Sequence, residues 1–427
     1  MSSMENERRI MRGVHAVLPG RGFDHSELMP PGQAVIAYLA RAEIAAPGEE
    51  TVALDSAAGR FLARAVFADR DYPAAARSTM DGFALRSADT PGRFHIAGDV
   101  QMGQLFDGGI GAGECVRIPT GGFLPTGADA VVPIEQAHAD GDWAEISAAV
   151  PANDCLNAAG EDMKDGEAIL QRGRRIGPSE ISVLATLGIA QVAVYRKPRV
   201  GIISSGDELV GVGERAGPAQ IRDSNRYAIA ASLRQKGCEA VAFPTVADRP
   251  GELEKAIGEA LPLCDALILS GGSSVGTGDL TPGAINNLGE PGVVIHGLRV
   301  KPGKPTVFAL LGRKPVLGLP GNPTSALLIL EAVIAPVIAT LTGSAQRAML
   351  VTALLEEELT ARAGWTWYVP VCLRDDGGRY LARPLAIHSS SASLPARATG
   401  FLTIGEDVTE IARGATVNVQ PLMEGLI

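Results

Sequence analysis

Aromatic residues and cysteines are scarce in this chain of 427 residues. Phe, Trp and Tyr together make up 4% of the sequence, and the 5 cysteines are far apart, with no CxxC pair among them. An odd number of scattered cysteines argues against a disulfide framework and against a structural zinc site. The first residues carry charge but lack the apolar core of a signal peptide. We therefore expect a cytoplasmic protein.

Long hydrophobic runs are also lacking. The most apolar stretch, Ala326 to Leu341, is interrupted by Glu331 and Pro336 and is shorter than the ~20 residues that span a membrane, so we expect a buried helix. The net charge of −10 excludes a general attraction for nucleic acid or for an anionic membrane. An anionic ligand would therefore be bound locally, by backbone amides of glycine loops, by helix N-termini and by a few lysines.

The length and the patterning predict an α/β multidomain protein, since a domain contains about 150 residues. Apolar spacing predicts helices over Pro31–Arg41, Ser56–Leu62 and Gly177–Gly188. Apolar strands alternate with helices from residue 199, which indicates a parallel sheet covered on both faces. The predicted parts are a flexible N-terminal arm (1–29), a discontinuous, elongated helical domain (30–70 and 160–198), an inserted β-rich domain (71–159), an α/β domain (199–345) and a C-terminal β domain (346–427).

Three glycine-containing loops each follow a predicted strand of the α/β domain. They begin at Ile203 (ISSGDEL), Leu269 (LSGGSSVGTGDL) and Leu319 (LPGNPTS). Loops at the carboxyl ends of parallel strands meet at one edge of the sheet, and glycines let successive N–H groups form an anion-binding nest. Each loop alone could equally be a structural turn, but together they predict a shared site. Its candidate binding residues are Ser205, Gly206, Asp207, Ser270, Gly271, Gly272, Ser273, Pro320, Gly321, Asn322, Pro323 and Ser325.

Two lysines and several carboxylates add charge to this region. The prolines of KPGKPT stiffen the backbone around Lys301 and Lys304, so two fixed ammonium groups could bind an oxyanion with little loss of entropy. The alternative is a solvated surface loop. Glu208, Asp248 and Asp279 are candidate Mg²⁺ ligands, because Mg²⁺ commonly bridges carboxylates to substrate phosphates. A capping role for Asp248 at the protein surface would explain this residue equally well.

Eight motifs occur along the chain in the order typical of the molybdopterin molybdotransferase family, and the chain resembles that family in them. The family includes the bacterial enzyme and the E domain of gephyrin. The resemblance runs from about residue 30 to the C-terminus. It implies a helical domain, an inserted β-rich domain, a three-layer α/β molybdopterin-binding domain and a C-terminal β-barrel, in a homodimer. The motifs are STMDGFA, PTGGFLPTGADAVV, AGEDM, SSGDEL, QIRDSN, SGGSSVG with a following Asp, KPGKPT and LPGNPTSA.

The resemblance also implies a reaction, in which molybdenum passes from molybdate to adenylylated molybdopterin and AMP is released with Mg²⁺. The upstream adenylyltransferase and recipient molybdoenzymes would be partners, whereas nucleic acid and membranes would not. Asp81 and Thr120 would reach the site from the second subunit. The roles that the resemblance implies are catalysis for Asp81, Thr120, Glu208, Asp248 and Asp279, phosphate or nucleotide binding for Ser270, Gly271 and Gly272, and the molybdate side for Lys301, Lys304, Pro320, Pro323 and Ser325.

Three positions depart from the family pattern, since Asn157, Gly297 and Trp365 stand at or near places where many relatives carry a basic residue. Positive charge around an anionic ligand would then be reduced. The intact acidic residues and both lysines favour an active transferase, whereas the missing charges favour a divergent, non-catalytic paralogue that binds or carries the cofactor. A scaffold role is a third hypothesis without a supporting feature. The candidates for compensating charge are Arg172, Arg299 and Arg374.

Overall fold

The computed structural model describes residues 28–45, 47–271, 280–345, 348–386 and 391–422. These residues divide into two compact units, of which the smaller consists of Arg64–Arg172 and Ser179–Ala190. Nearly all of the arm predicted over residues 1–29 lies outside the described residues. The finer domain boundaries given above stay a prediction.

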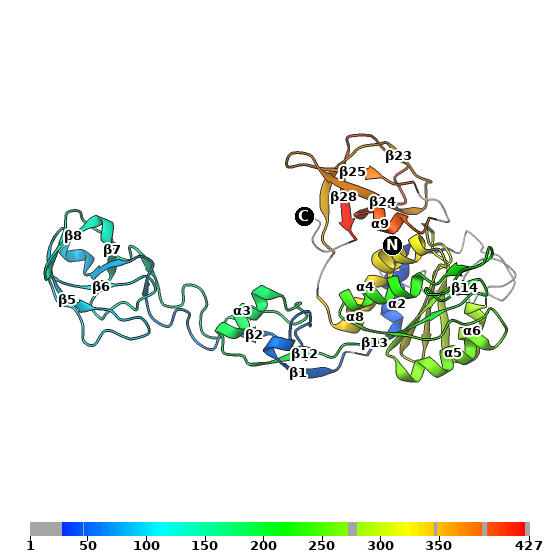
Figure 1. Ribbon diagram of the computed structural model, residues 1–427, viewed down its shortest axis with the longest axis horizontal. Coiled ribbons are helices and arrows are strands. Elements are labelled where there is room, and N and C mark those ends of the chain that lie inside the picture. The colour runs from blue at the N-terminus through cyan, green and yellow to red at the C-terminus, as the bar shows by residue number, and fades with distance from the viewer. Residues whose placement is uncertain (1–27, 46, 272–279, 346–347, 387–390, 423–427) are drawn as a thin grey trace, which may run out of the picture. The chain divides into compact units, whose positions relative to one another are not determined.

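A six-stranded mixed sheet forms the centre of the larger unit (Figure 1). Five strands run in the same direction, whereas β20 runs antiparallel to both of its neighbours, β21 and β18. The expected parallel sheet is therefore wrong at β20, because only Gly312 and Arg313 join β20 to β21 and so short a connection permits only a hairpin. The strands are, in sheet order, β16 (Glu239–Ala242), β13 (Arg199–Ser204), β17 (Ala266–Ser270), β21 (Lys314–Leu319), β20 (Val307–Leu311) and β18 (Pro291–His296).

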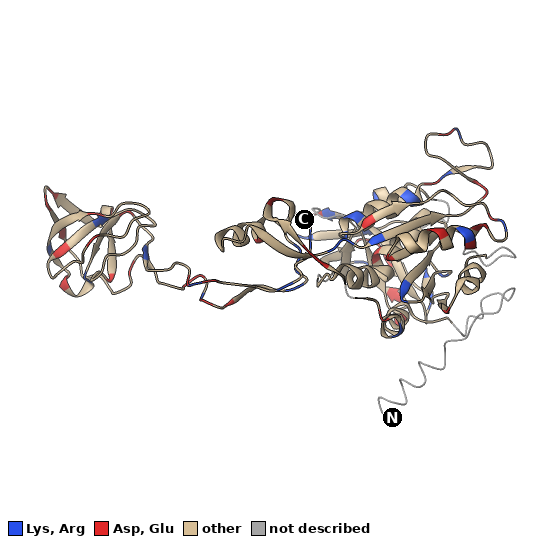
Figure 2. Cartoon of the chain, turned by 90° about the horizontal axis from the view of Figure 1, so that it is seen from below, with Lys and Arg blue, Asp and Glu red and all other residues tan. Residues whose placement is uncertain are grey.

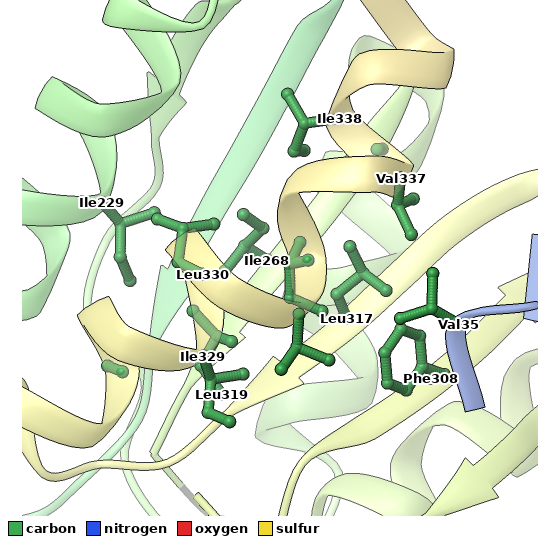
Figure 3. Packing of buried hydrophobic residues seen from close by; sticks show 14 of the residues in the cluster. Val35, Ile229, Ile268, Phe308, Leu317, Leu319, Ile329, Leu330, Val337 and Ile338 are labelled. Atoms are coloured by element: carbon green, nitrogen blue, oxygen red, sulfur yellow. The ribbon is translucent and has the colours of Figure 1, made fainter. Parts of the chain in front are cut away.

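Helices cover both faces of this sheet, which gives the three layers that were predicted. Ile268 and Leu317 point toward the long C-terminal helix of the domain (Figure 3), whereas Leu267 and Leu269 pack on the opposite face. This alternation follows from the period of two in a β-strand. On one face lie α2 (Pro31–Ala42), α4 (Asn225–Gln235), α7 (Pro323–Ile329), the π-helical turn η5 (Leu330–Ile334) and α8 (Ala335–Thr342); on the other lie α5 (Glu252–Ala260) and α6 (Thr281–Leu288).

The segment Pro323–Thr342 is long and apolar enough to cross a membrane by length and composition alone. Its side chains nevertheless belong to the core, since Ile329, Leu330 and Val337 are fully buried against the sheet (Figure 3). The buried helix predicted from the sequence is confirmed. Glu331 in its π-helical turn accepts hydrogen bonds from Ser232 Oγ at 2.5 Å and from Lys236 Nζ at 2.6 Å.

The N-terminal helix α2 is anchored to the sheet by Tyr38. Its hydroxyl donates a hydrogen bond to the carbonyl oxygen of Ala309 at 2.9 Å, and its ring lies 5.0 Å from the ring of Phe308. The helix predicted over Ser56–Leu62 is wrong. Residues Leu54–Ser56 form a single 3₁₀ turn, Gly59 adopts a left-handed φ of 77°, and the chain that follows makes isolated β-bridges.

A closed five-stranded β-barrel forms the C-terminal part, as the family resemblance implied. The short strand β19 (Val300–Lys301) adds to this barrel in parallel with β24, and Lys301 is thereby paired with Trp367. The loop that carries the lysines is thus bound directly to the C-terminal domain. The barrel strands are β24 (Thr366–Asp375), β25 (Tyr380–Pro384), β22 (Val351–Leu355), β28 (Thr416–Pro421) and β26 (Gly400–Ile404), where β26 also pairs with β24.

The smaller unit contains a second six-stranded sheet with a core that includes Phe83, Phe94 and Ile146. It also contains α3 (Pro178–Thr186), which lies within the helix predicted over Gly177–Gly188. Acidic and basic residues are interspersed along the elements of both units (Figure 2), consistent with anion binding by local groups. The strands are, in sheet order, β7 (Ala130–Pro133), β4 (Gly82–Leu85), β6 (Glu114–Ile118), β5 (Gly92–Asp99), β9 (Trp143–Ile146) and β8 (Ala137–Asp140).

Replacing the anchor of α2 should destabilise the protein. We expect Tyr38→Ala to lower the free energy of unfolding by about 3 kcal/mol or more, because it leaves a cavity and removes a buried hydrogen bond. Ile36→Ala on the same helix is the control, since Ile36 is 72% exposed and should change stability by about 0.5 kcal/mol or less. Urea unfolding measures both, and equal effects would contradict the anchoring role.

Candidate functional site

The three glycine loops meet at the carboxyl edge of the parallel strands. Ser205 N donates to the carbonyl oxygen of Ser270 at 3.0 Å, and Gly271 N lies 3.5 Å from the carbonyl oxygen of Leu319. Gly271 has a φ of 100°, and a Cβ on it would lie 2.2 Å from the Ser205 carbonyl oxygen. Only glycine allows this approach of two backbones. Gly272, Ser273 and Asp279 lie outside the described residues.

Carboxylates from two strand ends gather beside this junction. Gly206 N donates to Val246 O at 3.1 Å, and Asp248 N donates to Asp207 Oδ1 at 3.2 Å, so the loop after β16 lies against the first glycine loop. Partial burial, and then the charges of Glu208 and Asp207, raise the pKa of Asp248. Since the side chain of Asp248 is still exposed, solvent screens much of this repulsion.

Asp207, Glu208 and Asp248 are the described candidates for holding a divalent cation, because a positive ion would relieve the repulsion among them. Within the described ranges, no three His, Cys, Asp or Glu side chains are already arranged to hold a metal ion. Asp279, the third predicted ligand, lies outside those ranges. Glu208 is exposed, and its carboxylate lies over Gly206, 2.6 Å from where a Cβ on that glycine would stand.

The third loop is organised around the start of α7. Asn322 is the N-cap, and its Oδ1 accepts hydrogen bonds from Ser325 N at 3.1 Å and from Ser325 Oγ at 3.3 Å. Pro323 follows at the first helical position, where its missing N–H costs nothing. Pro320 is buried and Gly321 is exposed. Asn322 and Ser325, which were predicted to bind a ligand, therefore have a local capping role in the structure.

The two lysines line a pocket of about 410 Å³ between the KPGK loop and the barrel. Lys301 Nζ lies 4.0 Å from the centre of the Trp367 ring, within the range of a cation–π interaction. Arg362 adds a third cation to the lining and lies 5.3 Å from the ring of Trp365. Sequence analysis missed Arg362 and Trp367, because the pairing of β19 with β24 that brings them to the lysines has no signal in the sequence.

The departures from the family pattern have distinct surroundings. Arg299 is bound to Glu406 at 2.9 Å, and Arg374 is bound to Glu356 at 3.0 Å, so two of the three candidate compensating charges are already paired with acids. Gly297 has a φ of 86°, which disfavours a basic residue, or any residue with a side chain, at this position. Asn157, in β10 (Leu156–Asn157), stands opposite a basic residue, Arg77 in β3 (Arg77–Ser78).

Asp81 and Thr120 lie together in the smaller unit. Thr120 donates to Asp81 Oδ1 from its backbone N at 2.6 Å and from its hydroxyl at 2.9 Å. These hydrogen bonds, the backbone one first, lower the pKa of Asp81 and keep it ionised. Both residues are exposed. Asp81 and Thr120 thus form one exposed, negatively charged corner.

Comparison with known proteins decides the family. A model of the MoeA N-terminal region (domain I and II) matches residues 29–188, a "Probable molybdopterin binding domain" matches 201–340, and the MoeA C-terminal region (domain IV) matches 352–422. The molybdopterin molybdenumtransferase of Bacillus subtilis (strain 168) is 32% identical over 388 residues, which cover 88% of this chain and 90% of the relative. This chain belongs to the molybdopterin molybdenumtransferase family.

Other members of the family agree. The Haemophilus influenzae molybdopterin molybdenumtransferase is 36% identical over 300 residues, covering 70% of this chain and 74% of that protein. Among solved structures, a molybdopterin biosynthesis protein from Pyrococcus horikosii superposes with a TM-score of 0.76 at 30% identity, covering 92% of this chain and 99% of that one. The curated relatives bear the name of a transferase, and no comparison supports the non-catalytic alternative.

The repulsion among the acids predicts how Asp248→Asn behaves. A folded-state pKa above the usual value of about 3.9 means that ionised Asp248 opposes folding at neutral pH and that this penalty vanishes below pH ~4. We expect the variant to raise the apparent Tm by at most a few degrees at pH 7, with the gain lost on acidification. Differential scanning calorimetry without Mg²⁺ measures this, and the exposed Glu358→Gln should show no such gain. A lower Tm at pH 7 would contradict the repulsion.

Proposed function

We propose that this enzyme transfers molybdenum from molybdate to adenylylated molybdopterin, with release of AMP, in molybdenum cofactor biosynthesis. The observation that carries the proposal is the junction of Ser205, Gly271 and Leu319, where three loops meet next to a group of carboxylates. The names of the relatives support the same reaction. A phosphate bound by glycine loops beside acids that hold a cation is an arrangement that suits this substrate.

Mg²⁺ is part of the proposal. Glu208 and Asp248, joined by Asp279, would hold the ion, and Asp207 would orient the neighbouring loop through its bond to Asp248 N. The ion supplies neutralisation of phosphate charge, which favours departure of AMP. The glycine loops that meet at Ser205 and Gly271 would bind the phosphate oxygens and hold the substrate in place.

Molybdate would be bound in the pocket of Lys301, Lys304 and Arg362. Three cations from two elements can accept a tetrahedral oxyanion from different directions, and charged hydrogen bonds are each worth about 1.5–3 kcal/mol. We infer that Arg362 replaces the charge that Trp365 does not supply.

The protein would act as a cytoplasmic homodimer, with Asp81 and Thr120 contributed by the second subunit. Their exposure and their mutual hydrogen bonds support this role, since they form a preorganised acid that another chain can reach. The upstream adenylyltransferase and the recipient molybdoenzymes would be transient partners.

The reaction is tested with purified protein, adenylylated molybdopterin, Mg²⁺ and molybdate, by following AMP release. We expect Glu208→Gln to lower kcat by roughly tenfold or more, because a charge next to the phosphates is lost. Glu239→Gln is the matched control, since Glu239 begins β16 at the opposite edge of the sheet and pairs with Arg199. Tight binding of the substrate by the wild type without any AMP release would favour the carrier hypothesis.

The lysine pocket is tested by titrating molybdate in the same assay. Lys301→Ala should raise the KM for molybdate roughly tenfold or more, because one charged contact is removed. Trp367→Leu should have a smaller effect in the same direction, since the ring only holds the ammonium in place, whereas Trp367→Phe should retain most of the affinity. Lys255→Ala, an exposed lysine on α5, controls for net charge. An unchanged KM in Lys301→Ala would contradict the assignment of this pocket to molybdate.

A further inference from the structure

Asn225, the first residue of α4, connects two of the three glycine loops through its side chain. Its Nδ2 donates one hydrogen bond to Ser270 Oγ and another to the carbonyl oxygen of Gly321, both at 2.9 Å. Asn225 is 8% exposed, and the two acceptors are 45 and 96 residues away in the sequence. A single buried amide thus joins the end of β17 to the loop after β21.

Capping of its own helix does not explain this arrangement. The first turn of α4 is capped by Asp223, whose Oδ1 accepts from Arg226 N at 3.1 Å. The Asp223 carboxylate also pairs with the Arg226 guanidinium at 3.2 Å. Asparagine near a helix start commonly caps with its oxygen, whereas here the nitrogen is directed away from the helix toward two other loops. The side-chain amide of Asn225 therefore connects the loops at Ser270 and Gly321 and does not cap its own helix.

The bond to Ser270 decides what the serine hydroxyl can do. An amide N–H can only donate, so Ser270 Oγ accepts from Asn225 and its own hydrogen is not directed at Asn225. Ser270 is 3% exposed, and its neighbour Gly271 makes the close contact with Ser205. An anion needs donors, and a hydroxyl whose lone pair is occupied from behind is preset to donate.

The bond to Gly321 fixes the second loop relative to the first. The position of a Cβ on Gly321 lies 3.7 Å from Gly271 Cα, which is van der Waals distance, so the two loops lie close together here. The Gly321 carbonyl oxygen is held by its hydrogen bond from Asn225. A carbonyl oxygen directed at a bound phosphate would repel it, so this hydrogen bond keeps the negative end of the Gly321 carbonyl from turning toward a phosphate at the junction.

We propose that Asn225 is a positioning residue of the phosphate-binding site, which sets Ser270 as a hydrogen-bond donor and turns the Gly321 carbonyl away from the anion. The inference rests on the proposed function, because it assigns the phosphate of the substrate to this junction. Asn225 itself does not touch the substrate. Asn225→Asp is the most informative variant, because its oxygens would repel the Gly321 carbonyl and would accept the Ser270 hydrogen, which reverses both effects at nearly constant volume.

Hydrogen–deuterium exchange of the ligand-free protein tests the connection without any assumption about the reaction. Asn225→Asp and Asn225→Ala should both increase exchange in peptides around Ser270 and Gly321. Ser232→Ala is the matched control, since it removes a buried hydrogen bond about two turns further along the same helix, from Ser232 to Glu331. Unchanged exchange in both loops would overturn the proposal.

Steady-state kinetics and calorimetric titration of adenylylated molybdopterin then test the positioning role. We expect Asn225→Asp to raise KM and Kd roughly tenfold or more, and more than Asn225→Ala, whereas Ser232→Ala keeps both values. In a Ser270→Ala background the effect of Asn225→Ala should be smaller than in the wild type, because part of it passes through Ser270.

The outcomes separate the two levels of the argument. Two outcomes would overturn the positioning role and leave the proposed function intact. One is faster hydrogen–deuterium exchange in the two loops with unchanged KM and Kd. The other is a double variant whose fold-change in KM and Kd equals the product of the fold-changes of Asn225→Ala and Ser270→Ala. A wild type that binds the substrate but releases no AMP would overturn the reaction, whereas a loss of binding in Asn225→Asp would still support the role of Asn225.

Discussion

The close approach of backbones at Gly271 is the constraint on which the site depends. Parallel strands β13 and β17 end side by side, and their loops can both turn over the sheet edge only if one of them has no side chain there. The space that a Cβ would fill is occupied by the carbonyl oxygen of Ser205. The strand ends and their loops are thereby packed closely at the sheet edge, where an acidic protein can build a local site for an anion from loop groups.

The acidic and the basic side chains of the proposed site lie in two different places. The carboxylates of Asp207, Glu208 and Asp248 lie beside the backbone amides, where a cation can be shared with phosphates. The cations of Lys301 and Arg362 lie with two tryptophans in the pocket at the barrel. Such a division suits a reaction with two anionic substrates of different size, since each charge type is concentrated where its own ligand binds and neither group neutralises the other.

The C-terminal barrel contributes to the site through its pairing with the two-residue strand β19. Because β19 pairs with β24, the KPGK loop is held in register against Thr366 and Trp367, and the ammonium of Lys301 comes to lie over an indole ring. The tryptophan at position 365 therefore does not leave the pocket without charge. Arg362, three residues earlier, supplies a guanidinium to the same lining.

Local pattern in the sequence determined the three-layer α/β domain, the buried helix Pro323–Thr342 and the set of loops that follow strands, because hydrophobic period and glycine position act within a few residues. The same local pattern led to two wrong predictions. Isolated β-bridges replace the helix predicted over Ser56–Leu62, and β20 is antiparallel because a two-residue connection joins it to β21. Only the tertiary structure decided that Asn225 joins Ser270 to Gly321 and that Arg362 stands with Lys301. These contacts join residues up to 96 positions apart, and the orientation of a side-chain amide depends on acceptors that the chain brings close only after it has folded.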